Sequence, residues 1–242
     1  MHVLILSLDT ASSSGSVAVL KNEQLLAVIS TATEETYSSR IFRQLQFLLG
    51  ELSTGIESFD LFAVNAGPGS FTGLRVGLTT AKAWAESFSK PIVAVSGLEA
   101  AALQAAVDDK PVISAMDARR SQIYAGAYRR DANSGASINE LSRISEDSVM
   151  TPLEFSRWLS TSPELSSAVL ASPNPTWLSS LLAAEDHSFA SRFAIREVSP
   201  VLAPWIGKIA HERALRGETV DALRLDANYV RRSDAEVNWK GK

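Results

Sequence analysis

The residues with the clearest capacity for chemistry follow an apolar run near the start of the chain. Asp9 and Thr10 come directly after "VLILSL", and Ser12 and Ser13 lie in the turn "DTASSSG". A carboxylate at a strand end can hold a hydrated Mg²⁺, and turn hydroxyls and amides can hydrogen-bond a phosphate. The alternative is an ordinary polar hairpin turn whose amides satisfy Asp9, because Asp, Ser and Gly are common turn residues.

A second candidate is the glycine-rich stretch "NAGPGSFTGLRVG" at positions 65–77. It follows an apolar run and precedes a helical pattern, and free amides at a helix N-terminus bind anions. Its glycines do not have the spacing of a Walker A loop or a dinucleotide fingerprint, and it lacks the Gly-x-Ser-x-Gly elbow of hydrolases. We therefore expect close packing here, with anion binding by Gly67, Gly69 and Ser70 as a secondary role.

The helical pattern after this loop carries a stripe of small residues. Gly73, Gly77, Ala81 and Ala85 recur every four positions. Glycine inside a helix costs about 1 kcal/mol relative to alanine, so two of them indicate that another backbone comes close. The stripe could pack within the chain or against a helix of a second subunit, and both alternatives remain open.

The histidines of the sequence and its lack of cysteine do not indicate a metal site or a hydrolytic active site. The histidines are His2, His187 and His211, and no two of them are four residues apart as in a helical zinc site. No local signature indicates a Ser-His-Asp triad. The chain has no cysteine and therefore no thiolate ligand or nucleophile. We predict no metal site and no catalytic residue.

The amino-acid composition and the net charge further limit the class of protein to which the chain can belong. The 242 residues are 45% hydrophobic and 21% charged, which is typical of a soluble globular protein. A net charge of -4 gives no global attraction for nucleic acid. The lack of cysteine fits a reducing compartment, and no apolar run is long enough to span a bilayer. We therefore expect a cytoplasmic protein that does not enter a membrane.

Hydrophobic patterns predict the elements that would position these residues. Continuous apolar runs at 3–8 and 61–66 predict buried strands, and apolar steps of three and four predict helices at 37–49, 72–89 and 200–216.

The chain also contains an internal similarity. "VLILSLD", a turn and "SVAVL" correspond to "PVISAMD", a turn and "IYAGAY", with Asp9 and Asp117 at matching places. This favours two related α/β halves, although two such short patterns can also match by coincidence. We place the halves at 1–97 and 98–242, with the last helix, about 200–216, as a candidate to pack back on the first half.

Five segments, taken together and in order, resemble the bacterial TsaB (YeaZ) family. They are "ILSLDTASSSGSVAV", "NAGPGSFTGLRVGLTTAKAWA", "VSGLEA", "AMDARRSQIYAGAY" and "ANYVRR". The resemblance covers nearly the whole chain and is strongest up to about Tyr128. It implies an α/β fold of the actin, sugar-kinase and Hsp70 (ribonuclease H-like) type, with two related halves, mixed sheets and a cleft.

The resemblance also implies a function and partners. It implies a scaffold subunit without catalysis of its own, which supports a TsaD-type catalytic paralogue in threonylcarbamoylation of a tRNA adenosine next to the anticodon. A TsaE-type ATPase joins the assembly, and tRNA is reached through the complex. ATP or ADP with Mg²⁺ at a shared interface is the cofactor that the resemblance allows.

The implied interface, for a homodimer or for pairing with the TsaD-type subunit, lies on the first two helices. The residues that we predict for it are Tyr37, Ile41, Leu45, Gly73, Leu74, Gly77 and Ala81. The catalytic relatives carry a His-x-x-x-His metal motif in the first helix, where this chain has "YSSRIFRQL". Two other functions stay as alternatives, a zinc metallopeptidase of the glycoprotease type and an ATP-dependent small-molecule kinase that uses Asp9.

Overall fold

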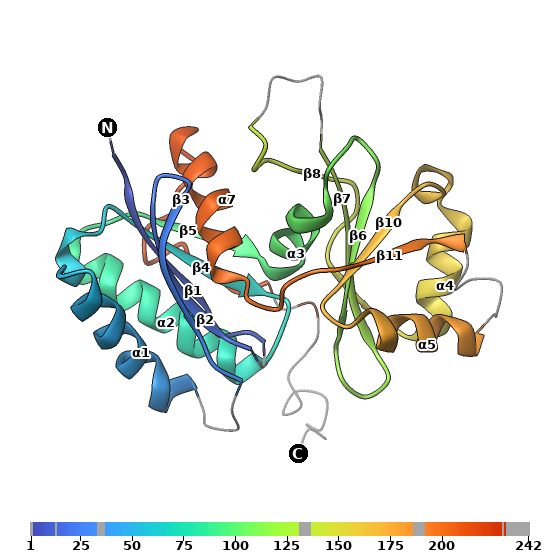
Figure 1. Cartoon of the computed structure of the whole chain (residues 1–242), viewed down its shortest axis with the longest axis horizontal. Helices are drawn as coiled ribbons and strands as arrows, with labels where there is room; N and C mark the ends of the chain where they lie inside the picture. The colour runs from blue at the N-terminus through green and yellow to red at the C-terminus, as the bar shows by residue number, and fades with distance from the viewer. Residues whose placement is uncertain are drawn as a thin grey trace, which may run out of the picture.

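The computed structural model describes residues 2–12, 14–32, 37–130, 137–185, 192–228 and 230, and within them the chain forms two α/β halves side by side (Figure 1). The first half contains a five-stranded sheet in the order β3-β2-β1-β4-β5. Strands β1 (Leu4–Asp9), β2 (Ser16–Lys21) and β3 (Gln24–Ser30) are antiparallel neighbours, and β4 (Leu61–Gly67) and β5 (Ile92–Ser96) continue parallel to β1. Every residue of β4 is buried, as expected for an apolar strand covered on both faces.

The second half repeats this arrangement. Its sheet has the order β11-β10-β6-β7-β8, and β9 pairs with β7 as well. The strands are β6 (Val112–Asp117), β7 (Ile123–Arg129), β8 (Ser142–Arg143), β9 (Ser148–Met150), β10 (Val169–Ser172) and β11 (Ala194–Glu197). Strands β6 and β7 are antiparallel, whereas β10 and β11 run parallel to β6.

The two sheets share one topology. The hairpin β1–β2 places Asp9 opposite Ser16, and the hairpin β6–β7 places Asp117 opposite Ile123 at the same end. Each sheet then adds two parallel strands on the far side of its first strand. The predicted fold class, two related α/β halves with mixed sheets, is confirmed.

Helices cover the sheets in layers (Figure 1). Helices α1 (Tyr37–Glu51) and α2 (Phe71–Phe88) lie on the outer face of the first sheet, and α4 (Pro152–Thr161) and α5 (Pro175–Glu185) on that of the second. Short 3-10 helices span Ile56–Ser58 and Pro163–Leu165. Within the described part of the chain, no helix combines the length and apolar character that a membrane crossing requires.

Two further helices of the described part of the chain lie between the sheets and form a shared core. Helix α3 (Gly97–Ala105) follows β5 of the first half but packs on β6 and β7 of the second. Helix α7 (Ala203–Leu215) follows the second half and packs on β1 and β2 of the first. Helix α3, which begins at the predicted boundary between the halves, thus covers the second sheet and α7 covers the first, and one apolar cluster joins both.

The stripe of small residues in α2 faces the chain's own first half. A Cβ atom on Gly73 would lie 1.9 Å from the Thr10 carbonyl oxygen, and one on Gly77 would lie 2.3 Å from Thr10 Oγ1. Ala81 and Ala85 are buried in the outer core of this half. Of the two alternatives, the described fold therefore uses the stripe for packing within the chain.

The same packing buries most of the residues that we predicted for a subunit interface. Ile41, Leu45, Leu74 and Ala81 are buried inside the first half, and the two glycines of the stripe contact Thr10. All six are buried in the single chain. A subunit interface on α1 and α2 stays a prediction, and the exposed side chains of these helices are the better candidates for its contacts.

We predict that Gly73→Ala destabilises the protein by about 1–3 kcal/mol, because its methyl group would collide with a backbone oxygen that cannot move aside. Gly50→Ala is the matched control, since Gly50 also lies in a helix but a Cβ atom there meets nothing within 4 Å. It should stabilise the protein by about 0.5–1 kcal/mol. Urea denaturation measures both changes, and equal effects of the two variants would contradict the close packing.

Candidate functional site

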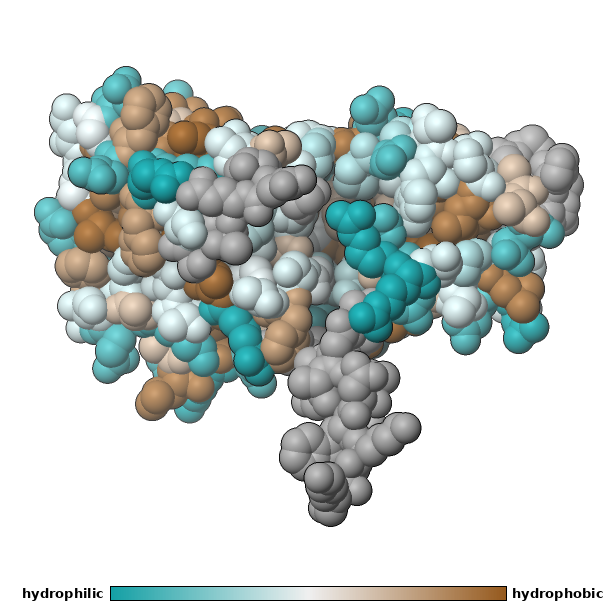
Figure 2. All heavy atoms as spheres, turned by 90° about the horizontal axis from the view of Figure 1, so that it is seen from below, coloured by the Kyte–Doolittle hydropathy of each residue, from teal (hydrophilic) through white to brown (hydrophobic). Residues whose placement is uncertain are grey.

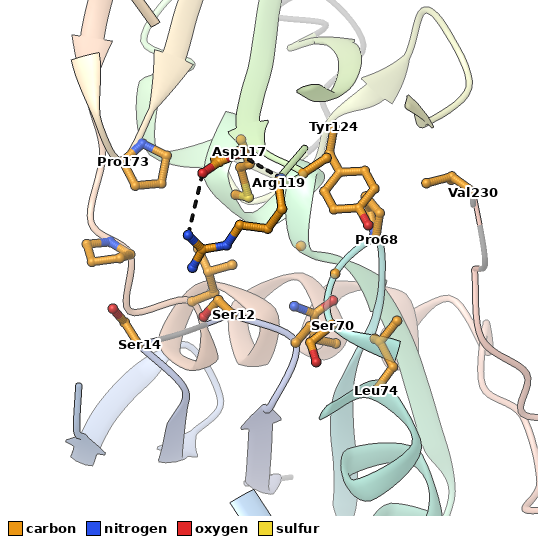
Figure 3. A pocket seen from close by; sticks show the side chains of 18 of the residues that line it. Ser12, Ser14, Pro68, Ser70, Leu74, Asp117, Arg119, Tyr124, Pro173 and Val230 are labelled. Atoms are coloured by element: carbon orange, nitrogen blue, oxygen red, sulfur yellow. Dashed lines mark hydrogen bonds and ion pairs between the residues drawn. The ribbon is translucent and has the colours of Figure 1, made fainter. Parts of the chain in front are cut away.

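A cavity of about 830 Å³ lies between the two halves, where the central strands of both sheets end. Figure 3 shows Ser12 and Ser70 of the first half facing Asp117 and Arg119 of the second. Ligands of open α/β sheets bind at the carboxyl ends of strands, and small-molecule pockets measure roughly 300–1,000 Å³. The position and size of this cavity both suit a small ligand.

Three of the residues predicted to bind an anion or nucleotide line this cavity, namely Ser12, Gly69 and Ser70. Ser13, from the same prediction, lies outside the described residues. Among the described residues of the lining, Arg119 is the single basic side chain. The cavity therefore offers mainly hydroxyl, amide and apolar groups.

Asp9 is fully buried and does not line the cavity. Its Oδ1 accepts hydrogen bonds from the Ala11 amide at 3.0 Å and from Asn65 Nδ2 at 2.9 Å, and its Oδ2 accepts one from Ser12 Oγ at 3.0 Å. Burial raises the pKa of Asp9, and these hydrogen bonds offset part of the rise. The carboxylate is thus satisfied by its own turn and by β4, as in the alternative that we described for a polar hairpin turn.

Thr10 and Gly67 also help to pack the turn after β1 against the glycine-rich loop after β4. Thr10 Oγ1 donates to the Gly73 carbonyl at 2.7 Å, and the Gly67 amide donates to Asn65 Oδ1 at 2.9 Å. Gly67 has φ +116°, and a Cβ atom there would lie 2.7 Å from the Asn228 carbonyl oxygen. That backbone conformation strongly favours glycine. Neither residue lines the cavity.

The start of α2 is held against the turn after β1. The Ser70 amide donates to the Ala11 carbonyl at 2.9 Å, while Ser70 Oγ accepts from the Gly73 amide at 3.2 Å as the N-cap. A Cβ atom on Gly69 would lie 2.6 Å from the same Ala11 carbonyl oxygen. Some of the amides that an anion would need are therefore already engaged.

Tyr37, which we predicted at a subunit interface, lines the cavity between the halves. Its hydroxyl accepts from the Gly15 amide at 2.6 Å and donates to the Ser12 carbonyl. The Arg40 guanidinium lies 4.1 Å from the centre of its ring. Burial raises the pKa of the Tyr37 hydroxyl, and the nearby Asp9 raises it further. Tyr37 thus holds the serine-rich turn in place.

The second half contributes a more accessible carboxylate. The Asp117 side chain is 41% exposed, and its Oδ2 lies 3.8 Å from Arg119 Nη1. Its Oδ1 accepts a hydrogen bond from the Arg119 amide at 2.7 Å. Arg119, Arg120 and Ser121 have φ values of 63°, 53° and 55°, which residues other than glycine rarely adopt. The match of Asp117 to Asp9 was visible in the sequence, but we did not select Asp117 as a site residue.

A buried polar network connects the halves, and no pattern in the sequence indicated it. Asp147 accepts hydrogen bonds from Ser96 Oγ at 2.6 Å, from Asn228 Nδ2 at 3.1 Å and from the Tyr128 hydroxyl. Burial raises the pKa of Tyr128 well above its usual value, and Asp147 adds to that rise. The network joins β5 of the first half to β7 of the second.

An ion pair reinforces the same junction. Arg213 Nη2 on α7 donates to both carboxylate oxygens of Glu99 on α3, at 2.8 Å and 2.7 Å, and its Nη1 donates to the Ala94 carbonyl at 2.8 Å. Burial raises the pKa of Glu99, while Arg213 counteracts the rise. Removing one partner of such a pair would leave a buried charge without compensation.

Comparisons with known proteins agree with this architecture. The family model for TsaD, the tRNA N6-adenosine threonylcarbamoyltransferase, matches residues 24–160, more than half of the chain. The tRNA threonylcarbamoyladenosine biosynthesis protein TsaB of Bacillus subtilis is 27% identical over 238 residues, which is 97% of each chain. The TsaB protein of Haemophilus influenzae is 26% identical over 249 residues, covering 99% of this chain and 97% of the relative.

Solved structures show the same fold. YeaZ from Pseudomonas aeruginosa matches with a TM-score of 0.73 at 23% identity, covering 94% of this chain and 99% of that chain. The ethanolamine utilization protein EutJ from Carboxydothermus hydrogenoformans matches with a TM-score of 0.50 at 11% identity, covering 87% of this chain and 90% of that chain.

The two halves with a cavity between them define a protein of the actin, sugar-kinase and Hsp70 fold type. The chain belongs to the TsaB/YeaZ family, within the wider family that the TsaD model describes. The resemblance drawn from the sequence is confirmed.

The buried carboxylate at position 9 leads to a prediction about pH. Its folded-state pKa lies above its ordinary value of 3.8, so between the two values the folded protein binds a proton that the unfolded chain has released. The contribution of Asp9 to the free energy of unfolding should therefore fall as the pH rises through this window. Asp9→Asn removes this dependence, and the difference in unfolding free energy, variant minus wild type, should increase with pH and then level off.

Urea denaturation at a series of pH values, starting near 3.8, tests this expectation. Asp9→Ala is the control for lost hydrogen bonds, because it leaves three donors without an acceptor and should be destabilised by about 1–3 kcal/mol per group. A difference for Asp9→Asn that decreases with rising pH would contradict the burial effect.

Proposed function

We propose that this chain is the TsaB-type subunit of an assembly that makes threonylcarbamoyladenosine in tRNA. The observation that carries the proposal is the similarity to TsaB proteins over 97% or more of this chain and 97% of each relative. Within that assembly the chain acts as a scaffold for a TsaD-type catalytic paralogue and performs no catalysis itself. Such a role corresponds to the cytoplasm, where tRNA is modified.

The geometry around the first turn supports a non-catalytic role. Helix α1 contains no histidine, and Tyr37 at its start is engaged with the turn after β1. The carboxylate of Asp9 already accepts three hydrogen bonds, so a cation there would have to displace its donors. These features support neither the metallopeptidase nor the kinase alternative.

The outer face of α1 supplies the surface for the paralogue. Phe42 and Phe47 are each 58% exposed, although Ile41 and Leu45 on the same helix are buried. Figure 2 shows apolar side chains at the surface of the half that carries α1 and α2. Exposed aromatic side chains are typical anchors of protein interfaces. Self-association through this face would compete with binding of the paralogue.

Other parts of the assembly follow from the same proposal. The net charge of -4 makes this chain a poor surface for the phosphates of tRNA, so tRNA is contacted through the partner. A TsaE-type ATPase joins the complex. ATP or ADP with Mg²⁺ binds at the shared surface, and the hydroxyls of Ser12 and Ser70 face the cavity that it would approach.

Reconstitution tests the proposed function directly. Purified TsaD-type and TsaE-type proteins, tRNA, ATP and the threonylcarbamoyl donor are combined with and without this chain, and modified nucleoside is measured by mass spectrometry. We expect product only when the chain is present. Equal amounts of product in both reactions would refute the proposal.

A second experiment tests the surface. The double variant Phe42→Ala/Phe47→Ala should bind the TsaD-type protein at least about tenfold more weakly, because truncating an interface anchor costs more than about 1 kcal/mol. Leu153→Ala on α4 is the matched control, since Leu153 is 55% exposed on the other half. Calorimetry gives both affinities, and sedimentation of the chain alone reports self-association. Unchanged affinity in the double variant would exclude this face.

A further inference from the structure

Three residues far apart in the sequence form a cluster on the side of α7. Glu23 lies in the turn between β2 and β3, and His211 and Glu212 lie on α7. Each offers one ligand atom, and these atoms lie within 4.8 Å of one another. None of the three lines the cavity between the halves.

His211 is the buried member of this cluster. It is 8% exposed, and its buried Nδ1 has no hydrogen-bond partner among the described residues. Glu23 Oε1 lies 4.0 Å from this nitrogen. An unpaired buried nitrogen is costly to a folded protein, and a bound cation is one way to satisfy it.

The surrounding elements hold the cluster in position. Asn22 has φ 55°. Its side-chain Oδ1 accepts a hydrogen bond from the Val3 backbone amide at 2.9 Å, and its backbone amide donates one to the Val3 carbonyl at 2.8 Å. These bonds fix the turn that carries Glu23. One helical turn before His211, Gly207 lets α7 approach β2 closely, because a Cβ atom there would lie 2.3 Å from Leu20 Cδ1.

Ser137, in the segment before β8, orients the side chain of Glu212. Ser137 Oγ donates to Glu212 Oε1 at 2.7 Å and leaves the other carboxylate oxygen for a ligand role. A hydrogen bond of this kind is the usual support for a metal-binding carboxylate. The nearby cation Lys208 is directed elsewhere, since its Nζ lies 4.7 Å from the centre of the Trp205 ring.

We propose that Glu23, His211 and Glu212 bind one divalent transition-metal cation, with Zn²⁺ as the best match. One imidazole nitrogen and two carboxylate oxygens are a donor set that zinc accepts, with water in the fourth position. Ligand atoms about 2.1 Å from zinc lie about 3.4 Å apart, so the glutamates must rotate inward. Glu23 is free to do so, because its side chain is 46% exposed.

The bound cation would be structural. It would tie the turn between β2 and β3 to α7 and, through Ser137, to the second half. The sequence could not indicate it, because positions 23, 211 and 212 form no metal-binding spacing. This proposal does not depend on the function in tRNA modification.

The test uses the untagged full-length protein and zinc sulfate. Calorimetry should show one zinc ion per chain, and Co²⁺ should give visible absorption of a site with a nitrogen ligand. Glu23→Gln should weaken zinc binding at least about tenfold, and Ser137→Ala should weaken it about 10–100-fold as a supporting residue. His211→Gln should abolish the Co²⁺ spectrum.

Two matched variants control for surface binding. His2→Gln removes an exposed histidine beside the same turn, and Glu57→Gln removes a glutamate outside the cluster. Both should keep wild-type affinity and stoichiometry. Circular dichroism verifies that each variant is folded, and the exposed position of Glu23 keeps the test valid if His211→Gln does not fold. No zinc binding by the wild type, or equal affinity in Glu23→Gln, overturns the proposal.

Discussion

The contact between the turn after β1 and the glycine loop after β4 is the constraint on which the rest of the site depends. Thr10 Oγ1 donates to the Gly73 carbonyl at 2.7 Å, and the Ser70 amide donates to the Ala11 carbonyl at 2.9 Å. Because β1 and β4 are parallel neighbours, both turns lie at the same end of the sheet. Their contact forms one wall of the cavity. The glycines therefore serve packing first, and this leaves fewer free amides for an anion.

The two halves are joined by the helices between their sheets and by buried polar groups. Helix α3 covers the second sheet and α7 covers the first, and Arg213 on α7 pairs with Glu99 on α3 at 2.7 Å. Asp147 adds hydrogen bonds from Ser96 and Tyr128. A buried polar network tolerates little displacement, because any member that loses its partner pays the full cost of desolvation. The relative position of the halves is thus specified by polar contacts as well as by the shared apolar core.

Much of the fold followed from the sequence, because its causes are local. The continuous apolar run at 61–66 predicted a doubly covered strand, and the two strand–Asp–turn–strand patterns predicted related halves. The direction in which the stripe of α2 faces was not predictable, since a spacing of four defines a helix face but not its neighbour. The hydrogen-bond partners of Asp147 were not predictable either. Ser96, Tyr128 and Asn228 are far apart in the sequence and come together only in the folded chain.

The two halves end their first strands on an aspartate but use it in opposite ways. Asp9 is fully buried, because Asn65 of β4 and the closed turn satisfy its oxygens. Asp117 keeps 41% of its side chain exposed beside Arg119, since its turn opens toward the cavity. A ligand between the halves would therefore meet one accessible carboxylate and not a facing pair. The two halves thus share one topology at the first hairpin but differ at the turn, which is closed around Asp9 in the first half and open to the cavity at Asp117 in the second.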